Sequence, residues 1–248
     1  MIRFIILLLL VIFYLIITIP IWIIALILRL FNKHAATMIG RGIANFGFFV
    51  AKLMAGIKLK LEDMDKVPDS AVKKVVFIGN HRSFFDIILS NLSYKGPLGF
   101  VAKKELLLVP SLNVWMYLIN CRFIDRKNMK QSIKVLTDAC EDVNRGFSSM
   151  MIFPEGTRNK GKEGTILKFH SAALKIAVKA GCTIVPVGIS NSRSVFEAQF
   201  PALKPSTVVI RYGDPIDTSA LSAEEKKNVA DTVSVKVQEL LDKNMGLY

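Results

Sequence analysis

Two long apolar stretches open the chain, and shorter apolar runs follow them. The first stretch, from Phe4 to Leu28, contains no charged residue. As one straight helix it would extend roughly 37 Å, which exceeds the ~30 Å hydrocarbon core of a bilayer. Pro20 divides the stretch, so it either kinks one spanning helix or marks the bend of a helix that enters and leaves a single leaflet. The pattern therefore predicts a membrane-associated helical segment at the N-terminus.

The second apolar stretch, from Ala35 to Ile57, is interrupted by Arg41 and Lys52. This pattern fits an interfacial helix in the headgroup region, and it fits a core helix of the main domain equally well. A cleaved signal peptide explains the first stretch poorly, because the apolar run is too long for an h-region and no small-residue cleavage site follows it.

Charge and proline enter the sequence between Lys58 and Pro68. We place a boundary there, between N-terminal membrane-anchoring helices in residues 1–60 and a second domain in residues 61–248. In that domain, apolar β-rich runs alternate with helical patterns. The predicted strands are 74–79, 99–102, 121–125, 149–153, 183–188 and 207–212, and the predicted helices are 87–92, 129–146, 168–180 and 223–241. This alternation indicates an α/β domain with a mostly parallel central sheet flanked by helices.

Composition and charge narrow the set of partners. Hydrophobic residues make up 52% of the chain, and the formal net charge is +13. Such a charge suits nucleic acid, an anionic membrane surface or a plain solvated surface. Basic residues follow the first apolar stretch, as the positive-inside rule predicts for a cytoplasmic face: Arg29, Lys33, Arg41, Lys52, Lys58 and Lys60. No nucleic-acid-binding motif is visible, so we expect a membrane protein whose active site faces the cytoplasm.

The numbers and spacing of cysteines and histidines indicate the redox compartment and argue against one kind of metal site. The three cysteines are odd in number, widely spaced and without a Cys-x-x-Cys motif, which suits a reducing compartment: they are Cys121, Cys140 and Cys182. The histidines are His34, His81 and His170. With so few histidines, we expect no multi-histidine metal site.

One histidine lies in a setting that suggests catalysis. Asn80 and His81 follow directly after the predicted buried strand 74–79, and Asp86 lies five residues beyond His81. If His81 lies in the strand-to-helix turn and Asp86 in the first helical turn, their side chains can meet, and the helix dipole favours an acid there. The spacing also fits a capping box between Ser83 and Asp86, and the two roles do not exclude each other.

The chemistry that suits this pair is general base catalysis. A neutral imidazole can remove the proton of an alcohol as it attacks an acyl carbon near pH 7. A carboxylate on the other ring nitrogen fixes the tautomer and stabilises the imidazolium that forms. Ser83 is only two residues from His81 and lacks the G-x-S-x-G elbow, so we do not expect a covalent serine mechanism.

A second motif, Phe-Pro-Glu-Gly-Thr-Arg, follows the predicted strand 149–153. Gly156 permits close approach to the backbone, Thr157 offers two donors, and Arg158 can grip a phosphate with two parallel hydrogen bonds. The alternative is a tight loop that carries an exposed arginine. Taken alone, the motif leaves both interpretations open.

Two more predicted strands are followed by basic residues. Lys103 comes after strand 99–102, and Arg126 comes after strand 121–125. Lys103 is equally typical of a charged helix start. Because the carboxyl ends of parallel strands meet at one edge of a sheet, three cationic strand ends around one histidine suggest an anionic substrate.

Together these motifs resemble the glycerolipid acyltransferase family, of the lysophosphatidic acid acyltransferase type. The family has an N-H-x-x-x-x-D block, a block that ends in Ile-Asp-Arg, an F-P-E-G-T-R block and a hydrophobic block with a central proline. Here these blocks occur in the family's order as Asn80–Asp86, Phe123–Arg126, Phe153–Arg158 and Ile184–Val187. The sequence departs from the family's Pro-x-x-Gly at Pro110–Asn113 and from its Lys-x-Gly at Lys168–His170, which leaves acyl length and acceptor open.

The resemblance implies the glycerol-phosphate acyltransferase fold and an acyl transfer from acyl-CoA or an acyl carrier protein to the free hydroxyl of lysophosphatidic acid. It implies His81 as the general base, assisted by Asp86. It also implies a set of residues that bind the phosphoglycerol acceptor: Glu155, Gly156, Thr157, Arg158, Lys103 and Arg126. A thioester is already activated, so no cofactor or metal is expected.

The expected partners are membrane lipid, the membrane surface and the acyl thioester, with acyl carrier protein as one form of the donor. Three alternatives remain at this point. The acceptor is glycerol phosphate or another lysolipid, or the protein binds anionic lipid without catalysis, or it hydrolyses lipids.

Overall fold

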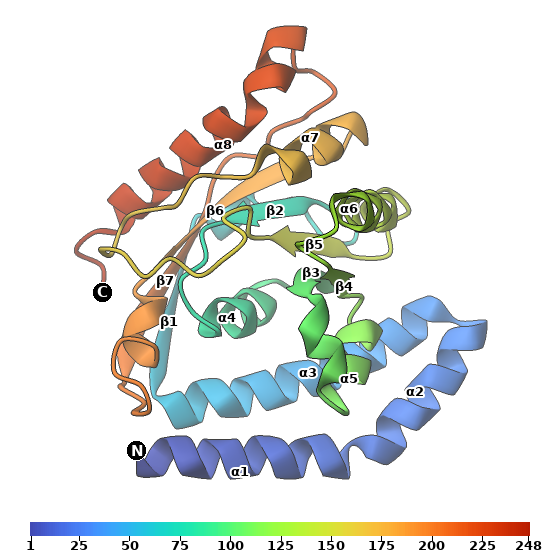
Figure 1. The fold of residues 1–248 in the computed structure, drawn as a ribbon, viewed down its shortest axis with the longest axis vertical. Helices are drawn as coiled ribbons and strands as arrows, with labels where there is room; N and C mark the ends of the chain where they lie inside the picture. Colours follow the sequence, from blue (N-terminus) through green and yellow to red (C-terminus); the bar gives the residue numbers. More distant parts are fainter.

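A single seven-stranded sheet forms the centre of the computed structural model, which describes residues 1–248 (Figure 1). Its strands are β1 (Ile57–Glu62), β2 (Val76–Gly79), β3 (Leu98–Lys103), β4 (Arg122–Ile124), β5 (Ser149–Ile152), β6 (Ile184–Ser190) and β7 (Ser206–Tyr212). They lie in the order β1-β7-β6-β2-β5-β3-β4, and every neighbouring pair is parallel except the antiparallel pair β6–β7. This is the mostly parallel α/β sheet that the alternating pattern predicts.

Helices cover both faces of the sheet. They are α1 (Ile2–Ile17), α2 (Ile19–Phe31), α3 (Lys33–Ala55), α4 (Phe85–Ser93), α5 (Leu112–Leu118), α6 (Met129–Asn144), α7 (Ser171–Lys179) and α8 (Ala223–Asn244), with 3-10 turns η1 (Met64–Lys66), η2 (Lys104–Leu108) and η3 (Ser192–Val195). Buried residues of α6, α7 and α8 pack on one face, and those of α3 and α4 pack on the other. Figure 1 shows the resulting three layers.

The central strand β2 shows why its sequence is continuously apolar. Val76 and Ile78 pack into the core beneath α6, α7 and α8, whereas Phe77 packs into the core beside α3 and α4. Since a strand places successive side chains on opposite faces, a strand covered on both sides needs apolar residues throughout. This strand leads directly into the histidine motif, so its burial fixes where that motif begins.

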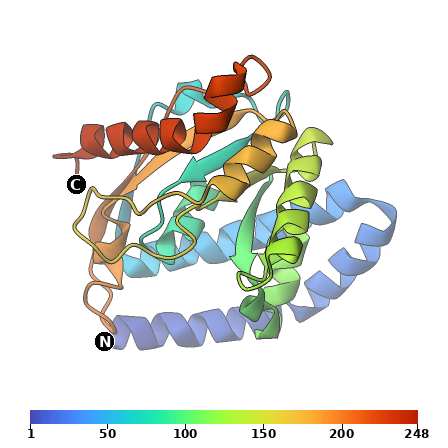
Figure 2. The same ribbon diagram turned by 45° about the horizontal axis from the view of Figure 1, so that its top comes forward.

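The N-terminal helices lie on the side of the sheet that carries α3 (Figure 2). The α1 helix ends at Ile17, and α2 has Pro20 in its first turn, a position that proline tolerates because the first amides of a helix lack internal partners. Helices α1 and α2 meet at an angle of 49°. Neither of them, nor any other single helix, has the length and apolar composition to cross a bilayer, whereas the bent pair does when its length and composition are taken together.

The second apolar stretch combines the two interpretations that its pattern leaves open. In α3, Ala51 and Ala55 are buried in the main core, while Phe46, Phe49 and Leu53 are exposed on the other side. The helix therefore has one face on the sheet domain and one face outside it.

The predicted domain boundary between residues 60 and 61 falls inside β1, which pairs with β7 along its whole length. Gly56 ends α3 with φ of 71°, a left-handed conformation that glycine adopts without steric cost, and the chain enters β1 at the next residue. The sheet therefore begins at Ile57, before the predicted boundary, because this short glycine turn joins α3 directly to an edge strand.

Candidate active site

The motifs lie at the carboxyl ends of neighbouring strands. β2 lies between β5 and β6, so the histidine motif after β2 is adjacent to the Phe-Pro-Glu-Gly-Thr-Arg loop after β5. Asn80 is fully buried and fixes the chain as it leaves β2: its side-chain amide donates to the carbonyl of Ile189 at 2.8 Å, and its side-chain oxygen accepts from the Ile189 amide at 2.8 Å. Asn80 thereby continues the pairing with β6 for one further residue.

His81 and Asp86 form a hydrogen-bonded pair. The distance from His81 Nδ1 to Asp86 Oδ2 is 2.8 Å, and the same oxygen accepts from the backbone amides of Arg82 at 2.7 Å and Ser83 at 2.8 Å. Asp86 lies in the first turn of α4 and is fully buried. The carboxylate therefore caps the helix start and orients the imidazole at once. With Nδ1–H donating to Asp86, Nε2 carries the lone pair that a general base needs.

The backbone and ring of His81 are held independently of Asp86. The ring stacks on Phe153, with centroids 4.4 Å apart and planes inclined by 15°. The His81 amide donates to Glu155 Oε1 at 2.8 Å, and the His81 carbonyl accepts from the Asn159 amide at 2.7 Å. The side chain is 15% exposed, so substrate can reach it although its position is fixed on several sides.

Glu155, which was predicted to bind the substrate, has both carboxylate oxygens bound by backbone amides of the protein and also lines the cavity described below. Its Oε1 accepts from the His81 amide and its Oε2 accepts from the Leu167 amide at 3.1 Å, and the residue is 3% exposed. Burial raises the pKa of this carboxyl group above its ordinary value, against the lowering effect of the two amides. Both oxygens are thus occupied by the protein itself, and a buried carboxylate would repel a phosphate. Glu155 supports the histidine loop.

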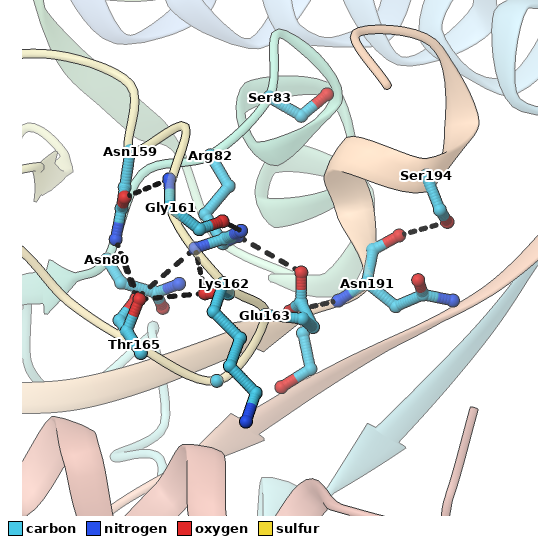
Figure 3. Close-up of polar contacts among 12 residues, drawn as sticks. Asn80, Arg82, Ser83, Asn159, Gly161, Lys162, Glu163, Thr165, Asn191 and Ser194 are labelled. Carbon is cyan, nitrogen blue, oxygen red and sulfur yellow. Dashed lines mark hydrogen bonds and ion pairs between the residues drawn. The ribbon is translucent and has the colours of Figure 1, made fainter. Parts of the chain in front are cut away.

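A buried arginine ties the histidine loop to the segment after the second motif (Figure 3). The guanidinium of Arg82, a residue only 2% exposed, donates to the carbonyls of Gly161 at 2.7 Å, Lys162 at 3.1 Å and Thr165 at 3.3 Å. Its Nε lies 3.1 Å from Glu163 Oε2. Because an arginine fork can satisfy several carbonyls at once, one side chain holds this whole irregular segment.

A cavity of about 610 Å³ opens beside the second motif. Its wall includes Gly156, Thr157 and Arg126, together with His170 and residues from β3, β5 and the starts of α6 and α7. Gly156 has φ of 66°, and a Cβ there would lie 3.3 Å from the His170 ring. The loop therefore needs glycine for its conformation and leaves little room for a side chain.

A second cavity, apolar and of about 310 Å³, includes part of the histidine motif in its wall. Its lining comes from α1, α3, α4 and α5, and all but one of the lining residues are hydrophobic. Phe84, within the histidine motif, and Ile88, one turn further along α4, form part of this wall. The histidine motif thus contributes Phe84 to the apolar cavity, and His81 stacks on Phe153, which lines the polar cavity.

The sequence profile described as Acyltransferase matches residues 58–190, which is more than half of the chain. The chain belongs to the acyltransferase family.

Individual relatives agree with this family assignment. The acyltransferase is 30% identical over 186 residues to the 1-acyl-sn-glycerol-3-phosphate acyltransferase of Saccharomyces cerevisiae, a match that covers 75% of this chain and 60% of the yeast protein. It is 26% identical over 188 residues to the Escherichia coli K12 protein of the same name, with 76% and 75% covered.

A solved structure supports the fold. The crystal structure of the 1-acyl-sn-glycerophosphate (LPA) acyltransferase from Thermotoga maritima superposes with a TM-score of 0.73 at 22% identity and covers 97% of both chains. This likeness confirms the predicted α/β fold, and the profile match together with the relatives confirms the predicted family.

Within the acyltransferase, only part of the predicted acceptor set comes together. Glu155, Gly156, Thr157 and Arg126 share one cavity wall. Lys103 is half exposed and pairs with Glu105 at 3.1 Å, and Arg158 is half exposed and pairs with Glu197 at 3.1 Å. Neither of these two cations is among the residues that line the cavity.

Some functional residues of the acyltransferase carry no motif signal on their own. Phe153 belongs to a motif, but its stacking on His81 depends on the adjacency of β5 and β2. Arg82 stands at a variable position between Asn-His and the aspartate. Glu197 lies outside all four blocks, and a lone glutamate in a loop offers nothing in the sequence by which it could be found.

Proposed function

We propose that this acyltransferase moves an acyl chain from an acyl thioester to the free hydroxyl of lysophosphatidic acid, and so forms phosphatidic acid. The observation that carries the proposal is the His81–Asp86 pair, with Nδ1 bound to a buried carboxylate and the ring partly open to substrate. The two relatives described above bear the name of enzymes that act on this acceptor. Their names support the choice of acceptor.

In the proposed reaction, His81 Nε2 takes the proton of the acceptor hydroxyl while its oxygen attacks the thioester carbonyl carbon. The new C–O bond forms, the tetrahedral intermediate collapses, and the C–S bond breaks. The imidazolium returns its proton to the departing thiolate, so no acyl-enzyme forms and no metal or cofactor is consumed. Asp86 holds the ring in the correct tautomer and stabilises the imidazolium in each half of the reaction.

The two cavities suit the two ends of such a substrate. The wall of the polar cavity offers Arg126, Thr157 and the backbone of Gly156 to the phosphate, and Arg158 directly follows Thr157 in the chain. The apolar cavity beside Phe84 suits an acyl chain, since nearly all of its lining is hydrophobic. The acceptor would thus lie across the His81 loop, with its hydroxyl near Nε2 and its charged head on the cationic side.

A membrane surface is the proposed location, with the active site toward the cytoplasm. Supporting this location, the outer face of α1 and α2 leaves large apolar side chains exposed, among them Ile2, Leu9, Phe13, Ile16, Ile24 and Phe31. Exposed apolar side chains gathered on two adjoining helices favour insertion into the headgroup region. The net charge of +13 favours anionic lipid, and both acyl-CoA and acyl carrier protein are acidic enough to approach such a surface.

A panel of acceptors tests the proposal. The purified protein on anionic vesicles is given one radiolabelled acyl-CoA with lysophosphatidic acid, glycerol 3-phosphate, lysophosphatidylcholine or water alone. We expect rapid phosphatidic acid formation with lysophosphatidic acid and little product otherwise. A faster reaction with another acceptor would mean that this acceptor is the substrate. Release of free fatty acid would indicate a hydrolase. Vesicle binding without thioester consumption would indicate a protein that binds lipid without catalysis. Repeating the panel with acyl carrier protein identifies the donor.

A further inference from the structure

Glu197 is an acidic side chain that joins the two proposed halves of the site. It follows η3, and its side chain is 18% exposed. Its Oε1 accepts from the Phe84 amide at 2.7 Å and from Arg158 Nη1 at 3.1 Å, and its Oε2 accepts from the Ser83 hydroxyl at 2.7 Å. One carboxylate therefore contacts both the histidine motif and the Phe-Pro-Glu-Gly-Thr-Arg motif.

The first contact supports the start of α4. The Phe84 amide is among the first amides of this helix, which have no partner inside the helix, and the positive end of the helix dipole lies there. Ser83 also accepts from the Phe85 amide at 3.0 Å, so Glu197 and Ser83 together hold the turn that precedes Asp86. A shift of this turn would move Asp86 and, through it, the ring of His81.

The second contact directs Arg158. One terminal nitrogen of Arg158 donates to Glu197, and the side chain is half exposed, so its remaining donors are open to a ligand. An unrestrained arginine loses rotamer freedom when it binds a phosphate, whereas one held by a carboxylate has lost much of it already. Glu197 thus limits the positions from which Arg158 can reach the acceptor.

The segment that carries Glu197 is itself anchored on several sides. The Asn191 amide donates to Glu163 Oε1 at 2.8 Å, which links η3 to the Arg82 network (Figure 3). The Asn191 side chain donates to the carbonyl of Thr207 at 2.8 Å. Phe196 stacks on Phe4 of α1, with centroids 5.0 Å apart. A glutamate on such a fixed segment can serve as a rigid support.

We propose that Glu197 is a positioning residue, which sets the start of α4 through Ser83 and Phe84 and orients Arg158 toward the acceptor phosphate. The proposal rests on the proposed function, because it assigns Arg158 to the acceptor. It predicts that the two effects are separable. The carboxylate geometry supports kcat through the α4 start, and its negative charge supports acceptor KM through Arg158.

Two substitutions at this position separate the effects. Glu197→Gln keeps an oxygen for the Phe84 amide and a polar group for Ser83, but removes the charge, so acceptor KM should rise about 3- to 10-fold with a smaller loss of kcat. Glu197→Ala removes every contact, so kcat should also fall about 10-fold or more. Glu141→Gln is the matched control, because Glu141 is exposed and pairs only with Arg145 along α6 at 3.4 Å.

A double-mutant cycle with Arg158→Ala decides whether the KM effect passes through the arginine. We expect Glu197→Gln to raise KM no further once Arg158 is replaced. Equal KM increases in both backgrounds, or wild-type kinetics for both Glu197 variants, would overturn the proposal. Thermal unfolding checks that Glu197→Ala is folded, and the glutamine and arginine variants carry the test if it is not. A wild-type protein inactive on lysophosphatidic acid would count against the proposed function instead, and the cycle would then use the acceptor that the panel identifies.

Discussion

The histidine loop and the cationic side chains around it are built in opposite ways. In the loop, Asn80 and Asp86 are fully buried, and both form hydrogen bonds of 2.8 Å, Asn80 to the Ile189 backbone and Asp86 to the His81 ring. Of the predicted cations, Lys103 and Arg158 are about half exposed, and each pairs with one acidic neighbour. A proton transfer requires one orientation of the base, whereas a phosphate can be held by charges that adjust to it.

This contrast orders the expected effects of substitution. Removal of one partner inside the buried loop leaves an unpaired polar group and costs about 1–3 kcal/mol. Removal of an exposed charge costs about 1 kcal/mol or less, because water screens it and the long side chain gains freedom. Changes in the loop should therefore lower kcat, and changes among the cations should raise acceptor KM.

The largest effect is expected for His81→Ala. Without the base, kcat should fall by about 10²- to 10⁴-fold while the protein stays folded and bound to vesicles. Initial rates of phosphatidic acid formation measure the loss, and circular dichroism with vesicle sedimentation checks the fold and the membrane association. Replacement of the exposed His34 by alanine is the control. Undiminished transfer by purified His81→Ala would exclude His81 as the base.

Glu155→Gln tests whether the support beneath the histidine matters. The glutamine keeps one acceptor oxygen, but its NH2 group faces a backbone N–H in the place where the carboxylate had its second acceptor oxygen. One hydrogen bond is lost, so the His81 backbone is no longer held in position. We expect kcat to fall about 10-fold or more with little change in acceptor KM. Steady-state kinetics on both substrates provide the measurement, and Glu239→Gln, an exposed glutamate of α8, is the matched control. A change in acceptor KM without a change in kcat would instead indicate that Glu155 binds the acceptor.

Arg158→Ala should act mainly on the acceptor. The side chain is half exposed, so we discount its charge-assisted contact to about 1 kcal/mol and expect a roughly 5-fold higher acceptor KM with kcat largely kept. Varying lysophosphatidic acid at fixed acyl-CoA separates the two constants. An unchanged acceptor KM would argue against recognition of phosphate by Arg158.

The comparison also separates two cations that look alike in the sequence. Arg126 lines the polar cavity, whereas Lys103 pairs with Glu105 away from it. Arg126→Ala should raise acceptor KM by about 3-fold, and Lys103→Ala by less than about 2-fold. Parallel titrations with lysophosphatidic acid rank them. A larger effect at Lys103 would mean that the acceptor lies closer to β3 than the cavity suggests.

Much of the fold was predictable because hydrophobic periodicity reports directly on burial. The runs that form β2, β5 and β6 are apolar on both faces, and the helices α6 and α8 show an apolar stripe, so each element could be found from its own residues. β1 escaped prediction, because an edge strand with the sequence Ile-Lys-Leu-Lys-Leu-Glu sits where charge enters the chain and looks like a domain boundary.

The site, like the fold, was predictable from the sequence only in part. The sequence by itself determined the residue types and their order: a histidine and an aspartate five residues apart after a buried strand, and a Phe-Pro-Glu-Gly-Thr-Arg loop after another. Spacing alone left Asp86 between catalysis and helix capping, and the structure shows one oxygen that serves both, since Oδ2 reaches His81 Nδ1 and two amides at once.

Only the tertiary structure decided what surrounds that pair. The order β6-β2-β5 brings Ile189, His81 and Phe153 together although they are far apart in the chain, and it places Glu155 within hydrogen-bond distance of the His81 backbone. Glu197 reaches Ser83 across 114 residues of sequence. The hydrophobic periodicity of a segment does not predict such contacts. They depend on which strands become neighbours and on how the loops, which have no repeating pattern, pack against those strands.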